Sequence, residues 1–239
     1  MRLDDPAYVE RQYASEHRLA ARKSFYDEVE GDDAREIALQ AVREARPRAV
    51  VEVGCGEGEL AARMHEELRV RVVAIDRSAR MVELAVARGV DARLGDVQEL
   101  RFEDASFDVA VAAWVLFHVR DLTRGLGELE RVLRPGGRLV AVTNDADHLL
   151  EMFEHAGALE QRYELPFGGE NGADLLGRHF ARVERRAASG TVTVRDATAI
   201  RAYLRSAERF APFAEGVPEL DGPLVVRRRQ AVFVAEKAS

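Results

Sequence analysis

The chain has 239 residues, of which 47% are hydrophobic and 32% are charged, and its 35 basic and 42 acidic side chains give a formal charge of −7. A chain of this length folds around its own core, and its single cysteine excludes an internal disulfide and a zinc site built from four cysteines. The net negative charge, with arginines scattered among acidic residues, argues against a surface that binds nucleic-acid phosphates.

The sequence shows no sign of a secretory or membrane segment. Its first residues, MRLDDPAYVERQ, lack the apolar run of a secretory signal. The longest apolar stretch, residues 109–117, is much shorter than the ~20 residues that cross a bilayer. We therefore expect a cytoplasmic protein with no membrane partner, either a monomer or a homodimer.

The N-terminal part of the chain is expected to be helical. Residues 6–45 have helical periodicity in two pieces, and residues 30–33 separate them. Gly31 can end the first helix, and an aspartate can cap the second. We therefore assign residues 1–45 to an N-terminal helical cap.

From residue 46 onward, short β-branched runs alternate with segments of helical period, which is typical of βαβ units around a parallel sheet. The expected strands are 49–53, 70–75, 91–94, 108–113 and 137–143. The expected helices are 60–68, 79–88 and 122–133. Residues 46–145 therefore form the predicted core of a single domain that extends over residues 1–239.

Residues 146–239 are expected to supply loops on the substrate side and the last strands of the sheet. We predict a helix at 146–157, a mobile glycine-rich loop at 167–172, and strands near 180–186 and 231–235. The three consecutive arginines at 227–229 suggest either an anionic partner or, as we expect, charges that protect an edge strand.

A glycine-rich segment after the first expected core strand carries the clearest signal for ligand binding. Gly54, Gly56 and Gly58 permit a tight turn and close approach of a ligand, and the following helix presents unpaired N–H groups. A nicotinamide-binding loop uses the spacing G-x-G-x-x-G, because its third glycine brings the helix close to a pyrophosphate. Here the spacing is G-x-G-x-G, and the acidic Glu59 is unsuited to a pyrophosphate. The loop therefore favours a ligand without phosphates.

The chain resembles the class I S-adenosylmethionine (SAM)-dependent methyltransferases of the small-molecule type over residues 48–145. Five motifs carry this resemblance in the family's order. They are E-V-G-C-G-E-G at 52–58, Asp76 at the end of the second strand, G-D-V at 95–97, the segment 107–118 around the fourth strand, and L-R-P-G-G at 133–137.

The resemblance implies a Rossmann-like, doubly wound α/β sheet of seven strands in the order 3-2-1-4-5-7-6. The seventh strand of this fold is antiparallel, and residues 230–235 are the candidate for it. The resemblance also implies SAM as the cofactor and transfer of its methyl group to an oxygen, nitrogen or carbon nucleophile. No metal is required for this chemistry, and we expect none.

The resemblance further implies roles for individual side chains. Asp76 would accept hydrogen bonds from both ribose hydroxyls, Asp96 would meet the adenine amino group, and Val97 would pack on the adenine ring. Glu52 would organise the glycine loop or reach the methionine amino group, and Cys55 is interpreted as a small packing residue. The full predicted cofactor set consists of Tyr13, Arg22, Glu52, Gly54, Cys55, Gly56, Asp76, Arg77, Met81, Asp96, Val97, Ala112, Ala113 and Phe117.

The cap offers two candidates for cofactor binding, and the strand ends offer two candidates for catalysis. Tyr13 could close over the donor and Arg22 could neutralise the methionine carboxylate, although an ordinary surface arginine fits equally well. His118, after the fourth strand, is the first candidate for a general base, and His148 is the second. The alternative for both histidines is a structural role, and Trp114 fits a core position as well as a ligand site.

The acceptor is expected to be a small molecule. Nucleic-acid amino-methyltransferases of this fold carry the tetrapeptide (N/D/S)-P-P-(Y/F/W) after the fourth strand, whereas residues 112–115 are A-A-W-V. Cytosine carbon-5 enzymes need a Pro-Cys nucleophile, and the only cysteine is Cys55. The alternatives are a non-catalytic SAM-binding module, a methyltransferase acting on RNA or protein, and a NAD(P) oxidoreductase, which Glu59 and the later motifs disfavour.

Overall fold

The computed structural model describes residues 3–5, 7, 9, 11, 21–22, 24–26, 28–161 and 165–239. These residues form one mixed sheet of eight strands in the order β1-β7-β8-β6-β5-β2-β3-β4. β4, β3, β2, β5 and β6 run parallel, whereas β8 is antiparallel to β6 and β7, and β7 is antiparallel to β1. The strands are β1 (Val29–Gly31), β2 (Ala49–Val53), β3 (Arg71–Asp76), β4 (Asp91–Leu94), β5 (Phe107–Ala113), β6 (Leu133–Asn144), β7 (Arg182–Val194) and β8 (Leu224–Glu236).

The order of seven strands, β4-β3-β2-β5-β6-β8-β7, is the expected 3-2-1-4-5-7-6, with the antiparallel strand where it was predicted. The predicted number of strands is wrong, because β1 adds an eighth at the edge. Residues 29–31 were expected near a helix boundary, but they pair with residues 190–192 of β7. Gly31 permits this pairing, since its φ is +94° and a Cβ there would lie 2.6 Å from the Ser189 carbonyl oxygen.

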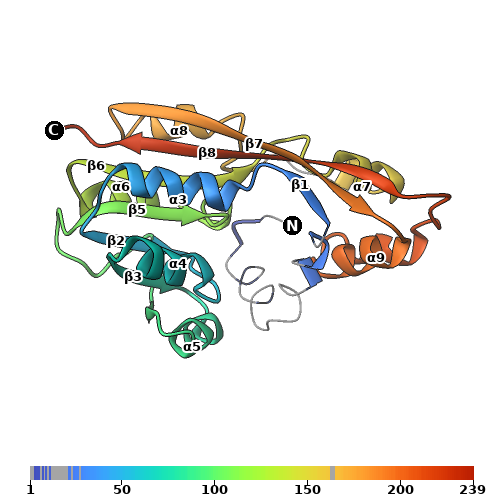
Figure 1. The fold of residues 1–239 in the computed structure, drawn as a ribbon, viewed down its shortest axis with the longest axis horizontal. Coiled ribbons are helices and arrows are strands. Elements are labelled where there is room, and N and C mark those ends of the chain that lie inside the picture. The colour runs from blue at the N-terminus through green and yellow to red at the C-terminus, as the bar shows by residue number, and fades with distance from the viewer. Residues whose placement is uncertain are drawn as a thin grey trace.

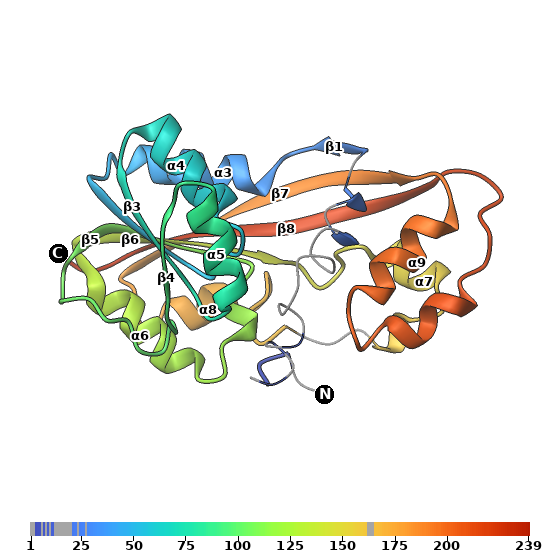
Figure 2. The same ribbon diagram turned by 90° about the horizontal axis from the view of Figure 1, so that it is seen from below.

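Helices cover both faces of the sheet (Figures 1 and 2). α3 (Ala34–Glu44), α4 (Glu59–Leu68) and α5 (Ala79–Ala87) lie on one face, and α6 (Leu122–Val132) and α8 (Gly172–Leu176) lie on the other. A buried apolar cluster fills the space between each helix layer and the sheet. The fold is therefore doubly wound, and the loops at the carboxyl ends of its parallel strands are available to hold a ligand.

The long antiparallel strands β7 and β8 extend beyond the parallel core (Figure 2). Their extension packs against α7 (Leu150–His155), α9 (Ala197–Arg205) and the 3-10 helix η3 (Ala211–Gly216) around a third apolar cluster. The extension is thus a second packed region beside the core.

Among the residues that the structure describes, no helix combines the length and apolar character that a membrane span requires.

The C-terminal part differs from expectation in the extent of its elements. The expected strands 180–186 and 231–235 are parts of the longer β7 and β8, and the expected helix 146–157 is reduced to α7. The helix α9 was not predicted. The prediction that 227–229 protect an edge strand is wrong. These residues pair with β7 on one side, and on the other side, beyond the end of the β6 pairing, the Arg227 and Arg229 carbonyl oxygens accept from the backbone N–H groups of Leu149 and Asp145.

The predicted mobile loop at 167–172 is also wrong. Phe167 is fully buried, and its ring centroid lies 5.8 Å from that of Phe233. Gly172 begins α8, where a Cβ would lie 2.5 Å from the Phe233 ring. The segment is therefore part of the core that covers β8.

The helix α6 contains two glycines in different surroundings, which gives a test of its packing. A Cβ at Gly127 would meet nothing within 4 Å, and alanine favours a helix over glycine by about 1 kcal/mol. We expect Gly127→Ala to raise the free energy of unfolding by about this amount, measured by urea denaturation. Gly125→Ala is the matched control: its Cβ would lie 3.1 Å from Val119 Cγ1, so the gain should be smaller. An equal gain at both positions would contradict this packing.

Candidate functional site

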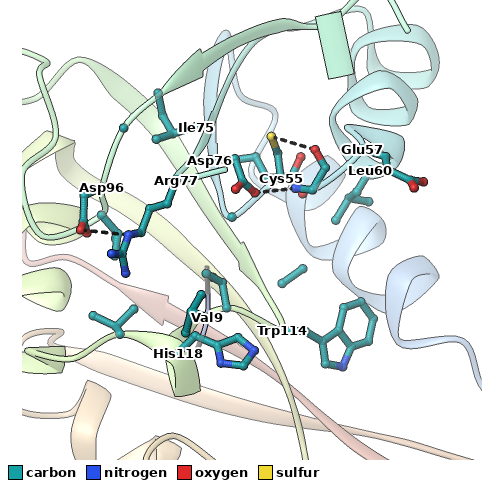
Figure 3. A pocket seen from close by; sticks show the side chains of 18 of the residues that line it. Val9, Cys55, Glu57, Leu60, Ile75, Asp76, Arg77, Asp96, Trp114 and His118 are labelled. Carbon is teal, nitrogen blue, oxygen red and sulfur yellow. Dashed lines mark hydrogen bonds and ion pairs between the residues drawn. The ribbon is translucent and has the colours of Figure 1, made fainter. Parts of the chain in front are cut away.

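A cavity of about 210 Å³ lies at the carboxyl ends of β2, β3, β4 and β5 (Figure 3). Its walls come from the glycine loop (residues 54–58) and from residues 75–77, 95–98 and 113–119, which follow the next three strands. In an open α/β sheet, ligands bind at this edge, where the strand order reverses beside the first strand. The fold therefore brings the motifs of four separate strands to one place.

The glycine loop is fixed against the end of β3. The backbone N–H groups of Gly54 and Cys55 donate to the Ile75 carbonyl oxygen at 2.7 and 3.2 Å. Gly54 tolerates no side chain, because its φ is +67° and a Cβ would lie 2.4 Å from Val115 Cγ2. Gly56 also has a positive φ, +53°, but a Cβ there would meet nothing within 4 Å. The loop backbone is thus accessible to a ligand at Gly56.

Asp76, at the end of β3, holds the loop from the other side of the cavity. Its Oδ2 accepts a hydrogen bond from Gly56 N at 2.8 Å, and its Oδ1 accepts one from Ser78 N at 2.8 Å. Burial raises the pKa of Asp76, and these backbone donors oppose that effect. Each carboxylate oxygen has two acceptor positions, so the oriented Asp76 carboxylate can accept further donors from a ligand.

Asp96 follows β4 and lies in a turn that its own side chain stabilises. Its Oδ1 accepts a hydrogen bond from Gln98 N at 2.9 Å, and Arg77 Nε lies 3.4 Å from its Oδ2. Figure 3 shows Arg77 reaching toward Asp96 along the cavity wall. Val97 is buried next to this turn and also lines the cavity. A carboxylate and an apolar side chain therefore lie together after β4.

Glu52 is a buried acid in the wall of the same cavity, with only 2% of its surface exposed. Its Oε2 has no hydrogen-bond partner in the described part of the chain. Burial and the negative charge of Asp76 raise the pKa of Glu52 from 4.5 to about 8. A positively charged ligand group would supply the missing partner and favour the ionised carboxylate.

Trp114 follows β5 in a left-handed backbone conformation, with a φ of +53°, which is uncommon for a residue other than glycine. Its backbone N–H donates to the Val142 carbonyl oxygen at 2.9 Å, and its Nε1 donates to Asn144 Oδ1 at 3.2 Å. The Arg35 guanidinium lies 5.1 Å from the ring centroid, within cation–π range. These contacts fix the indole at the end of the sheet.

A second cavity, of about 1020 Å³, adjoins the first. Arg35, Leu60, Trp114 and His118 line both cavities, so the two meet at the end of β5. The second cavity extends from there to side chains of β8, α7 and α9. Its lining contains both aromatic and charged residues, which is typical of a site for a polar small molecule.

His118, at the end of the 3-10 helix η1 (Leu116–His118), lies in the wall of the first cavity (Figure 3). It also lines the second cavity, so it marks the junction of the two. Its Nδ1 lies 3.0 Å from the Leu3 carbonyl oxygen. Because a carbonyl only accepts, a neutral ring donates from Nδ1 and carries its lone pair on Nε2. Burial lowers the pKa of His118 from 6.5 to about 4. The imidazole is therefore neutral at pH 7, with the lone pair on Nε2.

His148 lies in the second cavity with both ring nitrogens engaged. The Arg229 backbone N–H donates to Nδ1 at 3.1 Å, and the Tyr26 hydroxyl lies 3.1 Å from Nε2. Since Nδ1 accepts, a neutral ring carries its proton on Nε2, and this N–H donates a hydrogen bond to the Tyr26 hydroxyl oxygen. Burial raises the pKa of Tyr26, which also hydrogen-bonds with Tyr203, so its hydroxyl is neutral at pH 7. His148 thus orients Tyr26.

The structure places most of the predicted cofactor residues at the first cavity. Those that line it are Glu52, Gly54, Cys55, Gly56, Asp76, Arg77, Asp96, Val97 and Ala113. Arg22 and Phe117 line the second cavity, together with His148. Met81 and Ala112 are fully buried and are not among the described lining residues of either cavity. Tyr13 lies outside the described residues.

The thiol of Cys55 is buried in the glycine loop, where its Sγ donates to the Gly56 carbonyl oxygen at 3.6 Å. Burial raises the pKa of this thiol, and the charges of Glu52 and Asp76 add to the effect. A thiol that stays protonated is a poor nucleophile. This environment agrees with the interpretation of Cys55 as a packing residue.

The sequence analysis missed several residues of the two cavities, among them Arg35, Tyr26 and Tyr203. Arg35 lies in α3, Tyr26 precedes β1, and Tyr203 lies in α9. None belongs to a motif after a parallel strand, and tertiary packing alone brings them to the cavities. Among the described residues, no cluster of His, Cys, Asp or Glu is arranged to hold a metal ion.

Comparison with known proteins identifies the core. Residues 51–141 match the model of a methyltransferase domain. The chain is 36% identical over 113 residues to the demethylmenaquinone methyltransferase of Deinococcus radiodurans, covering 44% of this chain and 46% of that protein. It is 32% identical over 163 residues to a ubiquinone/menaquinone biosynthesis C-methyltransferase of Desulfotalea psychrophila, covering 64% and 62%. The chain spans about half the length of the curated relatives it matches.

The fold also has a close counterpart among solved structures. The YcgJ protein of Bacillus subtilis superimposes with a TM-score of 0.62 at 18% identity, covering 85% of this chain and 99% of that chain. This likeness shows the Rossmann-like fold. Together with the domain match, it shows that residues 51–141 carry a methyltransferase domain with this fold.

Proposed function

We propose that the protein transfers the methyl group of SAM to a small molecule held in the second cavity. The observation that carries this proposal is the junction of the two cavities at His118 and Trp114. A donor in the first cavity and an acceptor in the second would meet at the end of β5. A module that only binds SAM has no need of the larger cavity.

The residues of the first cavity fit SAM in their charge. Glu52, Asp76 and Asp96 are carboxylic acids, and α4 begins with Glu59 at the helix end that would otherwise attract a phosphate. In the proposed arrangement, Asp76 accepts the ribose hydroxyls and Asp96 accepts the adenine amino group. Glu52, whose buried Oε2 lacks a hydrogen-bond partner among the described residues, accepts a hydrogen bond from the ammonium of the methionine part.

When bound, SAM supplies a methyl group on positively charged sulfur, which a nucleophile attacks in line. The protein must align the acceptor, exclude water and remove a proton from acceptors that need it. His118 is placed for the last task, because its Nε2 carries the lone pair of a neutral ring at the junction. Trp114, fixed through Val142 and Asn144, forms the adjoining wall.

His148 contributes through Tyr26 in this proposal. Its Nε2–H donates a hydrogen bond to the Tyr26 oxygen. The Tyr26 O–H can therefore donate its own hydrogen bond to Tyr203 or to an acceptor molecule. The neutral Tyr26 hydroxyl would therefore orient a polar group of the acceptor. His148 positions this hydroxyl and does not itself serve as the base.

Two further observations support a small acceptor over RNA or protein. The chain carries a formal charge of −7, which opposes binding to RNA phosphates. Relatives with matching segments are named for methylation of small molecules, such as demethylmenaquinone and 27-O-demethylrifamycin SV. Methylation of a screened set of small molecules, with S-adenosylhomocysteine as the second product, tests the proposal. Binding of SAM without turnover of any acceptor would favour the non-catalytic module.

Replacing Asp76 tests the cofactor site. Asp76→Ala should weaken S-adenosylhomocysteine binding by about 2 kcal/mol, or about 30-fold, because hydrogen bonds to a charged group are lost. Fluorescence of Trp114, the single tryptophan, or calorimetry measures the affinity. Asp91→Ala is the control, since Asp91 starts β4 at the opposite edge and pairs with Arg93. Unchanged affinity in a folded Asp76→Ala protein, or tight binding of NAD(P)H, would refute the assignment.

The raised pKa of Glu52 predicts how stability depends on pH. In the folded protein Glu52 keeps its proton up to about pH 8, whereas the unfolded chain loses it near 4.5. The folded state therefore binds more protons in this window, and its stability should fall as the pH rises from 5 to 8. Thermal unfolding across this range measures the slope, which should be shallower for Glu52→Gln. Equal slopes in both proteins would contradict a buried, protonated Glu52.

Replacing His118 tests the proposed base. His118→Ala should reduce turnover of an acceptor by 10²- to 10⁴-fold while S-adenosylhomocysteine binding is retained. Because the pKa of His118 is about 4, the wild-type rate should show no acid limb near the ordinary value of 6.5. His65→Ala, on the exposed side of α4, is the control. Wild-type turnover by a folded His118→Ala protein would remove His118 as the base.

A further inference from the structure

The arginines at 227–229 of β8 divide between two environments. Arg227 forms an ion pair with Glu151, and Arg229 Nε lies 3.7 Å from Asp147 Oδ2. Arg228 points to the opposite side of the sheet, as alternation along a strand requires. It is only 8% exposed and lines the second cavity, between the buried side chains of Val226 and Gln230 on the same face. The middle arginine is thus the one that belongs to the cavity.

The buried guanidinium of Arg228 is incompletely satisfied. One terminal N–H donates to the Asp32 carbonyl oxygen, whereas the buried Nε has no hydrogen-bond partner among the residues that the structure describes. In the described part of the chain, no carboxylate lies within ion-pair distance of Arg228, unlike its two neighbours. Gly190, opposite Arg228 in β7, provides the space for the guanidinium, because a Cβ there would lie 3.1 Å from it.

An arginine does not relieve this situation by losing its proton, because a guanidinium stays protonated in proteins. Burying an unpaired charge costs several kcal/mol, so an unpaired arginine in a core is unfavourable. An anion that enters the cavity beside the guanidinium would supply the missing negative charge. Guanidinium groups match carboxylate and phosphate oxygens in geometry as well as in charge.

The surroundings of Arg228 favour an anion over a cation. Arg22 lies in the lining of the same cavity, where its Nε and a terminal N–H donate to Ser206 at 3.1 and 3.0 Å. The neutral Tyr26 hydroxyl lies close enough to both arginines to be affected by their charges. Of the four acids in the cavity lining, Asp145 is already bound by Arg185 at 2.8 Å, and Asp33 accepts from the Arg35 backbone N–H at 2.8 Å. The other two, Glu59 and Glu66, lie on α4. Positive charge and neutral hydroxyls therefore dominate this part of the cavity.

A row of polar side chains connects Arg228 with the junction of the cavities. Asn144 Oδ1 accepts from Trp114 Nε1 at 3.2 Å and from Gln230 Nε2 at 3.1 Å. Arg228 follows two residues further along the same face of β8, about 7 Å from Gln230 at the rise of a strand. An acceptor with its nucleophile near Trp114 could therefore reach Arg228 with a group at its other end.

We propose that Arg228, with Arg22 beside it, binds an oxyanion of the methyl acceptor, so that the substrate is a small molecule bearing a carboxylate or a phosphate. This proposal rests on the proposed function for the identity of the second cavity. In this arrangement, the anion lies at the end of the second cavity that β8 lines, and the group to be methylated lies at the other end, beside the end of β5.

Binding of simple aromatic probes tests this site without knowledge of the substrate. Benzoate and phenyl phosphate are the anionic probes, and benzamide is the neutral one, each titrated in low-chloride buffer with Trp114 fluorescence or calorimetry as readout. We expect wild-type protein to bind at least one anionic probe at least tenfold more tightly than benzamide. The preference between benzoate and phenyl phosphate distinguishes a carboxylate from a phosphate. Equal affinity for all three probes would overturn the proposal.

Matched variants of the same strand locate the binding. Arg228→Gln should lower the affinity for the preferred anion at least tenfold and leave benzamide binding unchanged, whereas Arg227→Gln, which removes the same charge outside the cavity, should change neither. Arg228→Lys keeps the charge and should retain part of the preference, which covers the case in which Arg228→Gln does not fold. Wild-type anion affinity in folded Arg228→Gln and Arg228→Lys would overturn the proposal.

Two further measurements separate this proposal from the proposed function and from a structural role. S-adenosylhomocysteine affinity should be the same in all these variants. If wild-type protein bound the anion but not S-adenosylhomocysteine, the proposed function would fail while the anion site stood. Arg228→Met should raise the unfolding midpoint in the absence of anions, because it removes an unpaired buried charge. A lowered midpoint together with unchanged anion affinity would show a purely structural arginine.

Discussion

The attachment of the glycine loop to the end of β3 is the constraint on which the site depends. The Ile75 carbonyl accepts from two consecutive N–H groups of the loop, and the Asp76 carboxylate accepts from a third, that of Gly56. The parallel register pairs Val53 with Ile75, so the loop after β2 begins where β3 ends. The bonds that satisfy the loop backbone therefore also orient the Asp76 carboxylate at the cavity wall.

This arrangement has an electrostatic consequence for the first cavity. Glu52 and Asp76 lie close together in a poorly solvated space, and the charge of Asp76 raises the pKa of Glu52. Neighbouring carboxyl groups of this kind ionise together only when positive charge is supplied. Arg77, which lines the same wall, forms its ion pair with a third acid, Asp96. A cationic ligand is therefore favoured over an anionic one, which supports SAM over a dinucleotide in the proposed function.

The core could be predicted from the sequence because its signals are local. β2 and β4 begin and end at the predicted residues, since each is a short run bounded by turn residues. β7 and β8 are longer than predicted because they pair with each other over thirteen residues, including polar ones that no local pattern marks as strand. β1 was missed for the same reason, because residues 29–31 become a strand only beside β7.

The residues of the site also fall into two groups, those that local motifs predict and those that only tertiary packing brings in. Glu52, Asp76 and Asp96 lie at or just beyond the carboxyl ends of strands, at fixed places in the motifs, so their presence at one cavity could be predicted from the order of the strands. Arg35 and Tyr26 reach the cavities through tertiary packing of segments outside the parallel core. The second cavity therefore depends on contacts between distant parts of the chain, which periodicity and motif spacing do not contain.

Alternation along β8 explains how one strand serves both the fold and the second cavity. Val226, Arg228 and Gln230 lie on one face, whereas Arg227 and Arg229 lie on the other, beside acids that follow β6. A shift of one residue in the register would bring the paired arginines into the cavity and remove the unpaired one. The Arg229 backbone N–H also fixes the tautomer of His148, so the same register orients the histidine that holds Tyr26. The long antiparallel pairing of β8 with β7 therefore sets the geometry of the cavity as well as the edge of the sheet.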